Sequence, residues 1–493
     1  MVISGRLGEV LDASYEWLLV RESGRSFALT RREIAVVMTD GDAASFQFID
    51  DNGFHSRTLT AYSFCGDEIS LDVVDRADGT IETVRLVPRV SASELTNEVE
   101  AARLQNANEI ARLIAEQYPG SKLGRVALNA ENGRLAQITF DTSNKVPMAA
   151  IGDVTDTLTV ESIFTAAMVW LEKLGARKKR PVLDIWIICE KRQAKNAQKL
   201  HALLSDRWKT KITVLEVIRK TGPLQLKCLP EKKIRDLWRE KATKLKLHSD
   251  IIPGQVTDAI LSLAPDQMDV IYSNNGATLR FLGLPFARVR TIKETETAWF
   301  GIGRERRILT DQNWGDLEEL VGILKQNRTH LSKNRRHEHY RASPEAWLES
   351  ILRKQISLLD ANLILSPIYN QFRSSNDKID LLALRRDGRL VVIELKTQPD
   401  REMVFQAADY WRKIELQRRR GILSAADLFD GREILDKPAL VYLAAPAWSF
   451  HRDFEFFART ISPEIEMWRF ELHESWREHV RVLARHRYTD DIV

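Results

Sequence analysis

The sequence predicts an α/β multidomain protein, in which a β-rich N-terminal domain and an α/β middle domain precede a C-terminal domain with a mixed sheet flanked by helices. The chain has 493 residues, which is more than one hydrophobic core usually organises. Short β-type runs fill its beginning, whereas strand and helix patterns alternate further on. With 44% hydrophobic and 29% charged residues, the composition is that of a globular protein without extended disorder.

The β-rich domain is expected over residues 1–90. Runs such as 17–20 consist of residues that favour strands, and turn-forming residues separate them. A linking helix is expected over 91–120, because Ser91 and Glu94 form a capping-box pattern in front of a long helical stretch.

The middle domain is expected over residues 121–330, where strands and helices alternate. The expected elements are the strands 135–141, 182–189 and 211–218 and the helices 160–174 and 193–207. The run 328–341 is strongly basic, so residues 331–342 are interpreted as an exposed linker or as a loop next to nucleic acid. Residues 343–493 form the last expected domain.

Charge and cysteine content restrict the class of protein. The net charge of +4 and the pI of about 8.8 are compatible with a polyanionic partner but do not establish one. Cys65, Cys189 and Cys228 are far apart, which argues against a disulfide scaffold and against a cysteine-based zinc site. The N-terminus does not resemble a signal peptide, and no apolar stretch is long enough to span a membrane. We therefore expect a cytoplasmic protein without a membrane partner.

Three chemically reactive residues are brought together by a predicted hairpin in the last domain. The runs 379–384 and 390–396 read as two strands joined by a short turn. Asp380 lies near the start of the first strand, and Glu394 and Lys396 lie near the end of the second, so the antiparallel pairing makes them neighbours. Glu394 and Lys396 are two residues apart, which puts both side chains on one face of the strand.

This arrangement predicts a metal-dependent site. Two carboxylates supply the oxygen ligands that Mg²⁺ or Mn²⁺ prefers, and Lys396 is placed to orient a water, or to deprotonate it if the site lowers the pKa of the lysine. The alternative is an ordinary surface ion pair on an edge strand, with Asp380 merely ending a turn. Acidic residues inside apolar strands favour the first interpretation, because a buried carboxylate is costly unless it binds a cation or pairs.

Two helices flank the hairpin in the sequence. Pro344 suits the first turn of a helix that carries Glu345 and Glu349 one turn apart on one face. A second helix begins near residue 401 and carries Gln406 and Tyr410, again one turn apart.

The order of these residues resembles the PD-(D/E)XK nuclease superfamily, in its RecB-like branch with a Q-x-x-x-Y helix. It is most similar to the C-terminal catalytic domain of the archaeal and bacterial NucS endonucleases, and the resemblance covers about 340–450. It implies a restriction-endonuclease-like αβ core for the last domain. The first 330 residues show no match to the N-terminal domain of the NucS enzymes, so their substrate preference is not carried over.

The resemblance also implies roles for individual residues. Asp380, Glu394 and the backbone carbonyl of Leu395 would hold the metal ion, and Lys396 would act on the attacking water.

In the same comparison, Gln406 and Tyr410 would contact the substrate backbone or brace the site. The helical glutamate of the family corresponds to Glu345, with Glu349 as a close competitor that spacing does not exclude.

Basic and aromatic residues nearby have two interpretations each. Arg412 and Lys413 either lie along a phosphate backbone or form an ordinary basic helix end, since cations favour helix C-termini. Trp411, Trp448 and Trp468 either stack on bases or pack in the core, which is the commoner use.

The function predicted from the sequence is a Mg²⁺- or Mn²⁺-dependent hydrolase of phosphodiester bonds in DNA, acting as an endonuclease rather than an exonuclease, in DNA repair or in defence. The middle domain would then take part in substrate recognition. One alternative is a non-cleaving nucleic-acid-binding module on a nuclease fold, and another is a nuclease that acts on RNA. Whether the DNA is single-stranded, duplex or branched stays open, and so does a homodimer.

Overall fold

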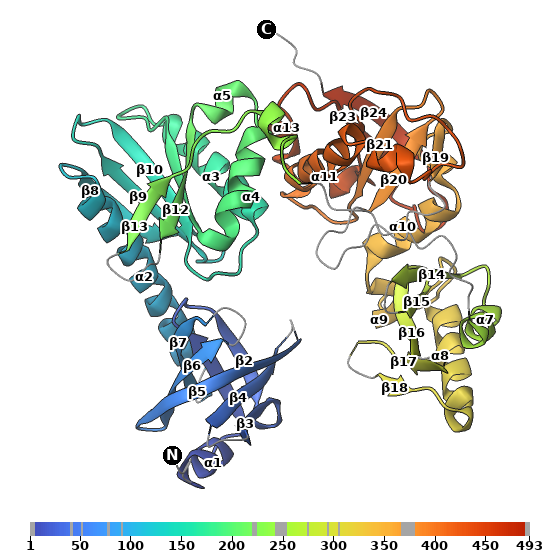
Figure 1. The fold of residues 1–493 in the computed structure, drawn as a ribbon, viewed down its shortest axis with the longest axis horizontal. Helices are drawn as coiled ribbons and strands as arrows, with labels where there is room; N and C mark the ends of the chain where they lie inside the picture. The colour runs from blue at the N-terminus through green and yellow to red at the C-terminus, as the bar shows by residue number, and fades with distance from the viewer. Residues whose placement is uncertain are drawn as a thin grey trace. The chain divides into compact units, whose positions relative to one another are not determined.

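The computed structural model describes residues 5–39, 43–50, 53–75, 79–89, 92–218, 224–241, 254–273, 276–292, 295–303, 306–365 and 380–488. The chain divides into two compact units (Figure 1). One consists of Met1–Gln198 and Thr210–Pro230, and the other of Lys199–Lys209 and Glu231–Val493. Within the described ranges, no helix combines the length and the apolar character that a membrane crossing requires.

The first unit begins with the helix α1 (Gly5–Asp12) and a seven-stranded antiparallel sheet. The strands are β1 (Glu16–Arg21), β2 (Ser26–Thr30), β3 (Ile34–Thr39), β4 (Ala43–Asp50), β5 (Gly53–Cys65), β6 (Glu68–Asp75) and β7 (Ile81–Pro88). Their order across the sheet is β2-β1-β7-β6-β5-β4-β3. The strand-favouring run 17–20 lies within β1.

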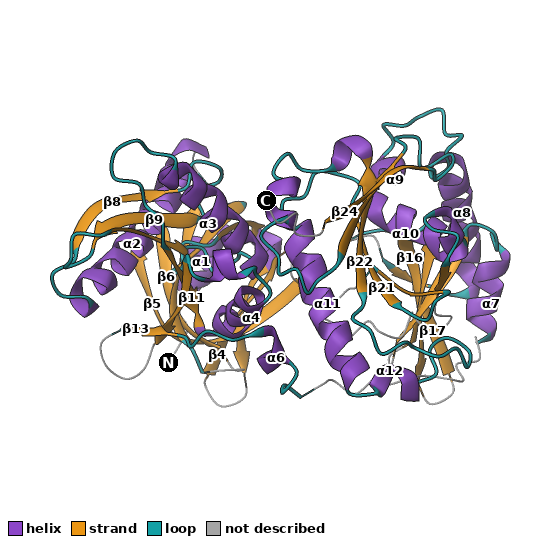
Figure 2. Ribbon diagram, turned by 90° about the horizontal axis from the view of Figure 1, so that it is seen from above, coloured by secondary structure: helices purple, strands orange, loops and turns teal. Residues whose placement is uncertain are grey.

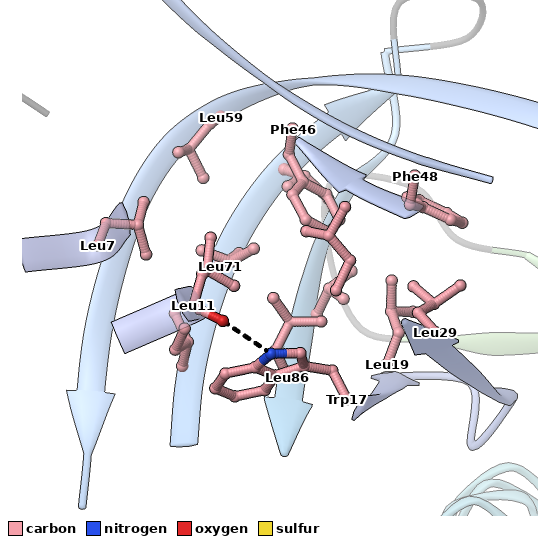
Figure 3. Packing of buried hydrophobic residues seen from close by; sticks show 14 of the residues in the cluster. Leu7, Leu11, Trp17, Leu19, Leu29, Phe46, Phe48, Leu59, Leu71 and Leu86 are labelled. Carbon is pink, nitrogen blue, oxygen red and sulfur yellow. Dashed lines mark hydrogen bonds between the residues drawn. The ribbon is translucent and has the colours of Figure 1, made fainter. Parts of the chain in front are cut away.

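Large apolar side chains fill the core of this sheet. Figure 3 shows Trp17, Phe46, Leu71 and Leu86 packed together with Leu11 of α1, and all five are nearly fully buried. Nε1 of Trp17 donates a hydrogen bond of 3.1 Å to the carbonyl oxygen of Leu11, which satisfies the polar atom of the buried indole. This contact holds α1 against the sheet.

A second, mixed sheet completes the first unit. Its strands are β8 (Lys122–Leu128), β9 (Leu135–Asp141), β10 (Pro147–Asp153), β11 (Ile185–Glu190), β12 (Ile212–Ile218) and β13 (Gln225–Cys228), in the order β13-β12-β11-β10-β9-β8. β10, β11 and β12 run parallel to one another. The helices α3 (Val160–Gly175) and α4 (Lys191–Ala202) lie between them in sequence, as parallel strands require. The strand expected at 135–141 is confirmed as β9.

The helix α2 (Ala92–Gln117) belongs to this mixed sheet. It packs against β8, β9 and β13, and its residues Ala107, Ala111 and Ile114 lie in the hydrophobic core. The helix thus connects the first sheet to the second in sequence, and one of its faces is also a structural part of the second sheet domain.

The second unit contains a five-stranded antiparallel sheet. Its strands are β14 (Met268–Ser273), β15 (Gly276–Phe281), β16 (Leu284–Ile292), β17 (Thr295–Phe300) and β18 (Arg307–Ile308), accompanied by the helices α7 (Gln255–Ser262) and α8 (Trp314–Asn327). Residues 121–330, for which the sequence suggested one α/β domain, thus contain two separate sheets. The second of these sheets is antiparallel, unlike the sheet of an α/β domain. The short turn at Leu282 and Gly283 shows why, since turns of this kind produce hairpins rather than parallel crossovers.

The C-terminal sheet of the second unit is mixed. Its strands are β19 (Leu363–Leu365), β20 (Leu381–Arg385), β21 (Leu390–Leu395), β22 (Leu440–Pro446), β23 (Met467–Leu472) and β24 (Val482–Tyr488), in chain order across the sheet. β21, β22 and β23 are parallel, and the other pairs are antiparallel.

Helices pack on this sheet and complete the domain. The principal ones are α10 (Pro344–Lys354), α11 (Met403–Arg419) and α13 (Phe454–Ala458). α11 packs against β21 and β22, and its position beside them can be followed in Figure 2. Short helices elsewhere are α5 (Asp206–Lys209), α6 (Ile234–Leu237), α9 (Glu338–Arg341) and α12 (Ile422–Ala425). The protein is therefore a mixed α/β multidomain protein, as the sequence predicts.

The basic run 328–341 is not an exposed linker throughout. Arg328 is 0% exposed, and its guanidinium donates hydrogen bonds to the backbone carbonyls of Phe281, Leu282, His339 and Ala342. Tyr340 of α9 is also buried. The charge pattern misled the sequence interpretation, because a buried arginine that binds several carbonyls looks the same in sequence as a solvated one.

Candidate active site

The predicted hairpin is confirmed. β20 and β21 pair antiparallel with Leu381 opposite Ile393, and the turn between them contains Gly388 at φ +86°. This positive φ suits a residue without a side chain. Asp380 immediately precedes β20, and Lys396 immediately follows β21, so both lie at the same end of the hairpin.

Short polar contacts hold the side chains at this end. Oδ2 of Asp380 accepts a hydrogen bond of 2.8 Å from the backbone N–H of Leu395. Nζ of Lys396 lies 3.0 Å from Oε1 of Glu394 and 3.1 Å from Oδ2 of Asp400. These contacts hold the two acids and the lysine at the same end of the hairpin, and their role as site residues stays a prediction. Asp400 was not among the predicted residues, and it lies four residues after the lysine in a segment that is neither helix nor strand.

Burial makes the charge of Glu394 expensive. The residue is 2% exposed, and burial together with the negative charge of Asp380 raises the pKa of its carboxyl group well above the ordinary value. Lys396 counteracts this shift only in part. Oε2 of Glu394 is buried and has no hydrogen-bond partner among the described residues. A buried carboxylate oxygen without a partner is the kind of atom that a bound cation satisfies.

Lys396 carries a positive charge in this setting. Burial lowers the pKa of its ammonium group, but Glu394, Asp400 and Glu345 raise it, and the net pKa lies above the ordinary value. Deprotonation of water by Lys396 would require a lowered pKa. The raised pKa favours the ammonium form of Lys396, which donates hydrogen bonds.

The two glutamates of α10 have different surroundings. The negative charge of Glu345 raises the pKa of both Glu394 and Lys396, which places this carboxylate within the electrostatic reach of the hairpin end. Glu349 is 1% exposed and forms ion pairs with Arg280 at 3.4 Å and with Arg353 at 3.3 Å. The structure therefore groups Glu345, and not Glu349, with the residues of the hairpin.

A second buried charge cluster surrounds Glu349. Arg280 on β15 is 2% exposed, and it also pairs with Asp269, the residue opposite it on β14. Gly283, in the turn after β15, lies so close to α10 that a β-carbon there would meet the carbonyl oxygen of Ala346 at 1.9 Å. The five-stranded sheet thus fixes the helix that carries Glu345. Arg280 lies far from the hairpin in sequence, and no sequence signal indicated this contact.

The helix that carries the other predicted residues, α11, also lies beside the hairpin. α11 packs against β21, and Tyr410 is partly buried. Burial raises the pKa of its phenol, and the charges of Glu394 and Asp380 raise it further, which places the ring near both carboxylates. Gln406 is partly buried one turn earlier on the same helix.

Arg412 and Lys413 both have partners within the protein. Arg412 is 5% exposed and forms an ion pair of 2.7 Å with Asp409. Lys413 pairs with the same carboxylate at 2.9 Å, and its ammonium group lies 5.5 Å from the ring centroid of Tyr410. This burial argues against Arg412 as a direct phosphate ligand. Both cations neutralise the carboxylate of Asp409, which explains why they lie at this position on the helix.

The donor set of the hairpin end suits a hard divalent cation. Asp380 and Glu394 are carboxylates at adjacent strand ends, and the orphaned Oε2 of Glu394 belongs to this pair. In the part of the chain that the structure describes, no group of three or more His, Cys, Asp or Glu side chains has the geometry of a metal site. A site here would therefore consist of two carboxylates completed by a backbone carbonyl, such as that of Leu395, and by water.

No protein-family model and no curated protein matches the chain. A solved structure described as EndoMS in its apo form matches 37% of this chain and 82% of its own, with 11% sequence identity and a TM-score of 0.14. A similarity at this level does not establish a shared activity.

Proposed function

We propose that residues 343–493 hydrolyse phosphodiester bonds in nucleic acid, with DNA as the first substrate to test. Asp380 and Glu394, with the carbonyl of Leu395, would hold Mg²⁺ or Mn²⁺. The observation that carries the proposal is the buried Oε2 of Glu394, which has no partner among the described residues although the charge of the group is strongly disfavoured by burial. A site that keeps such a group is expected to use it for binding a cation.

Each residue of the cluster has a distinct task in this proposal. A bound divalent ion supplies Lewis acidity, which neutralises charge on the scissile phosphate and lowers the pKa of a coordinated water. The backbone N–H of Leu395 keeps the Asp380 carboxylate at the strand end. The ammonium group of Lys396 would donate hydrogen bonds to the attacking water or to a phosphate oxygen, in keeping with its raised pKa.

Glu345 and Tyr410 would act around this centre. Glu345 adds a further carboxylate near Glu394, which can accept a hydrogen bond from a water of the site. Tyr410 can keep its proton because its pKa is raised, so its hydroxyl is a donor for the substrate backbone. Gln406, one turn away on the same helix, is expected to support the same contact.

Site-directed variants of the full-length chain test the proposal. Labelled single-stranded, duplex, flap and mismatch DNAs and one RNA are incubated with Mg²⁺, Mn²⁺ or EDTA. Wild type should cleave at least one substrate with metal, and Asp380→Ala and Lys396→Met should lower the rate by about a thousandfold or more.

A matched control is Asp387→Asn, which removes an acid from the turn at the opposite end of the same hairpin and should leave the rate within about threefold of wild type. Full metal-dependent cleavage by Asp380→Ala would falsify the assignment. Cleavage of RNA alone would keep the chemistry and change the substrate.

A further inference from the structure

The three tryptophans for which base stacking is one interpretation differ in exposure. Trp411 is 1% exposed and donates a hydrogen bond of 2.9 Å to the carbonyl oxygen of Ala439, so it is a core residue. Trp468 is partly buried, and its indole N–H donates to Glu466. Trp448 is 86% exposed, which leaves almost the whole indole accessible to a partner.

The backbone around Trp448 is fixed, although its side chain is exposed. The residue lies in a single turn of 3-10 helix that follows β22 directly. Its N–H donates a hydrogen bond of 2.9 Å to Oε1 of Glu474. The hydroxyl of the next residue, Ser449, donates a hydrogen bond of 3.0 Å to the carbonyl oxygen of Thr397. The indole is therefore presented from an ordered segment, so binding has to order its side chain but not its backbone.

These contacts place Trp448 beside the candidate active site. Thr397 follows Lys396 directly, so the hydrogen bond from Ser449 joins the segment of Trp448 to the end of β21. β21 and β22 run parallel with Leu395 opposite Ala444, and Lys396 donates its backbone N–H to the carbonyl oxygen of Ala444 at 3.1 Å. The carboxyl ends of both strands thus lie side by side, and Glu394 and Lys396 are at this end of β21.

The segment that carries Trp448 also carries an exposed cation. Arg452 lies four residues further on, and its side chain is 78% exposed. Its guanidinium lies 3.7 Å from the partly buried Asp453, and an ion pair of this length to an exposed arginine is weak enough to give way to a phosphate. Proteins bind single-stranded nucleic acid by stacking bases on exposed aromatic side chains, and cationic side chains from the same segment pair with the backbone.

We propose that Trp448 forms a stacking subsite for an unpaired nucleobase in the strand whose phosphate lies at Glu394 and Lys396. The inference rests on the proposed function and narrows its substrate to strands with an unstacked base close to the scissile bond. In a regular duplex both faces of each base are already covered, so the indole gains nothing there. Every base has a π face, so the subsite selects strand state rather than sequence.

Binding measurements with the full-length chain in EDTA, which prevents cleavage, test the subsite. The probes are a labelled single-stranded oligonucleotide and a blunt duplex of the same sequence, and the affinity is read from fluorescence anisotropy. Trp448→Ala should weaken single-strand binding by about ten- to a hundredfold, and Trp448→Phe by only about threefold. Duplex affinity should stay unchanged. Tyr15→Ala removes another exposed aromatic side chain, 66% exposed, and should have no effect on either probe.

An abasic scan separates stacking from a general loss of affinity. Single abasic sites are placed at successive positions in the oligonucleotide, and each is measured with wild type and with Trp448→Ala. Stacking predicts one position at which the abasic site weakens wild-type binding but does not weaken Trp448→Ala further, because both changes remove the same contact.

The outcomes distinguish this inference from the proposed function. If wild type cleaves while Trp448→Ala binds single strands as wild type does, or loses single-strand and duplex affinity equally, the subsite is refuted and the nuclease stands. If wild type neither binds nor cleaves nucleic acid, both proposals fail. Thermal unfolding of Trp448→Ala should match wild type, since the exposed side chain makes little contribution to the core.

Discussion

The second unit contains two buried charge clusters that differ in how their charges are compensated. Around Glu349, the carboxylates of Glu349 and Asp269 face Arg280 and Arg353 in direct ion pairs. Around Glu394, the pKa of the carboxyl group stays raised despite its contact with Lys396, and one oxygen has no partner among the described residues. Both clusters are built from acids inside apolar surroundings, but only the first is electrostatically closed.

The difference separates a structural cluster from a functional one. A closed cluster contributes to stability and geometry, because the removal of any member leaves a buried charge without its partner. An open cluster costs stability in the isolated protein, and it is retained where a ligand completes it. α10 joins the two, since it carries Glu349 in the closed cluster and Glu345 towards the open one. Variants of the cluster around Glu349 should therefore lower stability with little effect on cleavage. Variants of the cluster around Glu394 should lower cleavage with little effect on stability.

The largest effect on stability is expected at Arg280. Arg280→Met should lower the free energy of unfolding by about 3 kcal/mol, because it leaves the partly buried Asp269 without this cation and the buried Glu349 with Arg353 alone. Urea denaturation followed by circular dichroism measures the change. A decrease in the free energy of unfolding of less than about 1 kcal/mol would show that Arg280 is not needed to compensate these carboxylates.

The paired variants Glu345→Gln and Glu349→Gln should separate activity from stability. Glu345→Gln should slow metal-dependent cleavage by about ten- to a hundredfold with little change in unfolding free energy. Glu349→Gln should lower that free energy by about 1–3 kcal/mol and leave the rate per folded molecule within about threefold of wild type. Steady-state kinetics and denaturation of the same preparations provide the comparison. The reverse pattern would assign the helical acid of the site to Glu349.

The smallest effect on stability is expected at Glu394. Glu394→Gln removes a buried charge whose Oε2 is unsatisfied, so its unfolding free energy without metal should be within about 1 kcal/mol of wild type, or higher. Denaturation in EDTA measures this. A loss of several kcal/mol would mean that the carboxylate is needed for the fold, as in the closed cluster.

The sequence predicts the hairpin of the site well, and local physics explains why. Alternation with a period of two, a short turn and the spacing of Glu394 and Lys396 are all local, so the convergence with Asp380 follows from strand geometry alone. The same kind of argument predicted β9 to the residue.

What the sequence could not predict depends on distant contacts. Glu345 and Glu349 share a helix face, and only the approach of Arg280 from another sheet separates them. The burial of Arg412 against Asp409 and of Arg328 among backbone carbonyls is likewise invisible in a pattern of basic residues. Long-range pairing of this kind leaves no periodic signal in the chain.

Metal binding in the absence of substrate tests the central claim most directly. Thermal unfolding of wild type, Glu394→Gln and Glu349→Gln is followed during titration with Mg²⁺ or Mn²⁺. A ligand at a hundred times its Kd stabilises a protein by about 2.7 kcal/mol, and we predict a stabilisation of this order for wild type. Glu349→Gln should respond as wild type does, and Glu394→Gln should not respond. An equal response of wild type and Glu394→Gln, or no response of wild type at millimolar metal, would contradict the account.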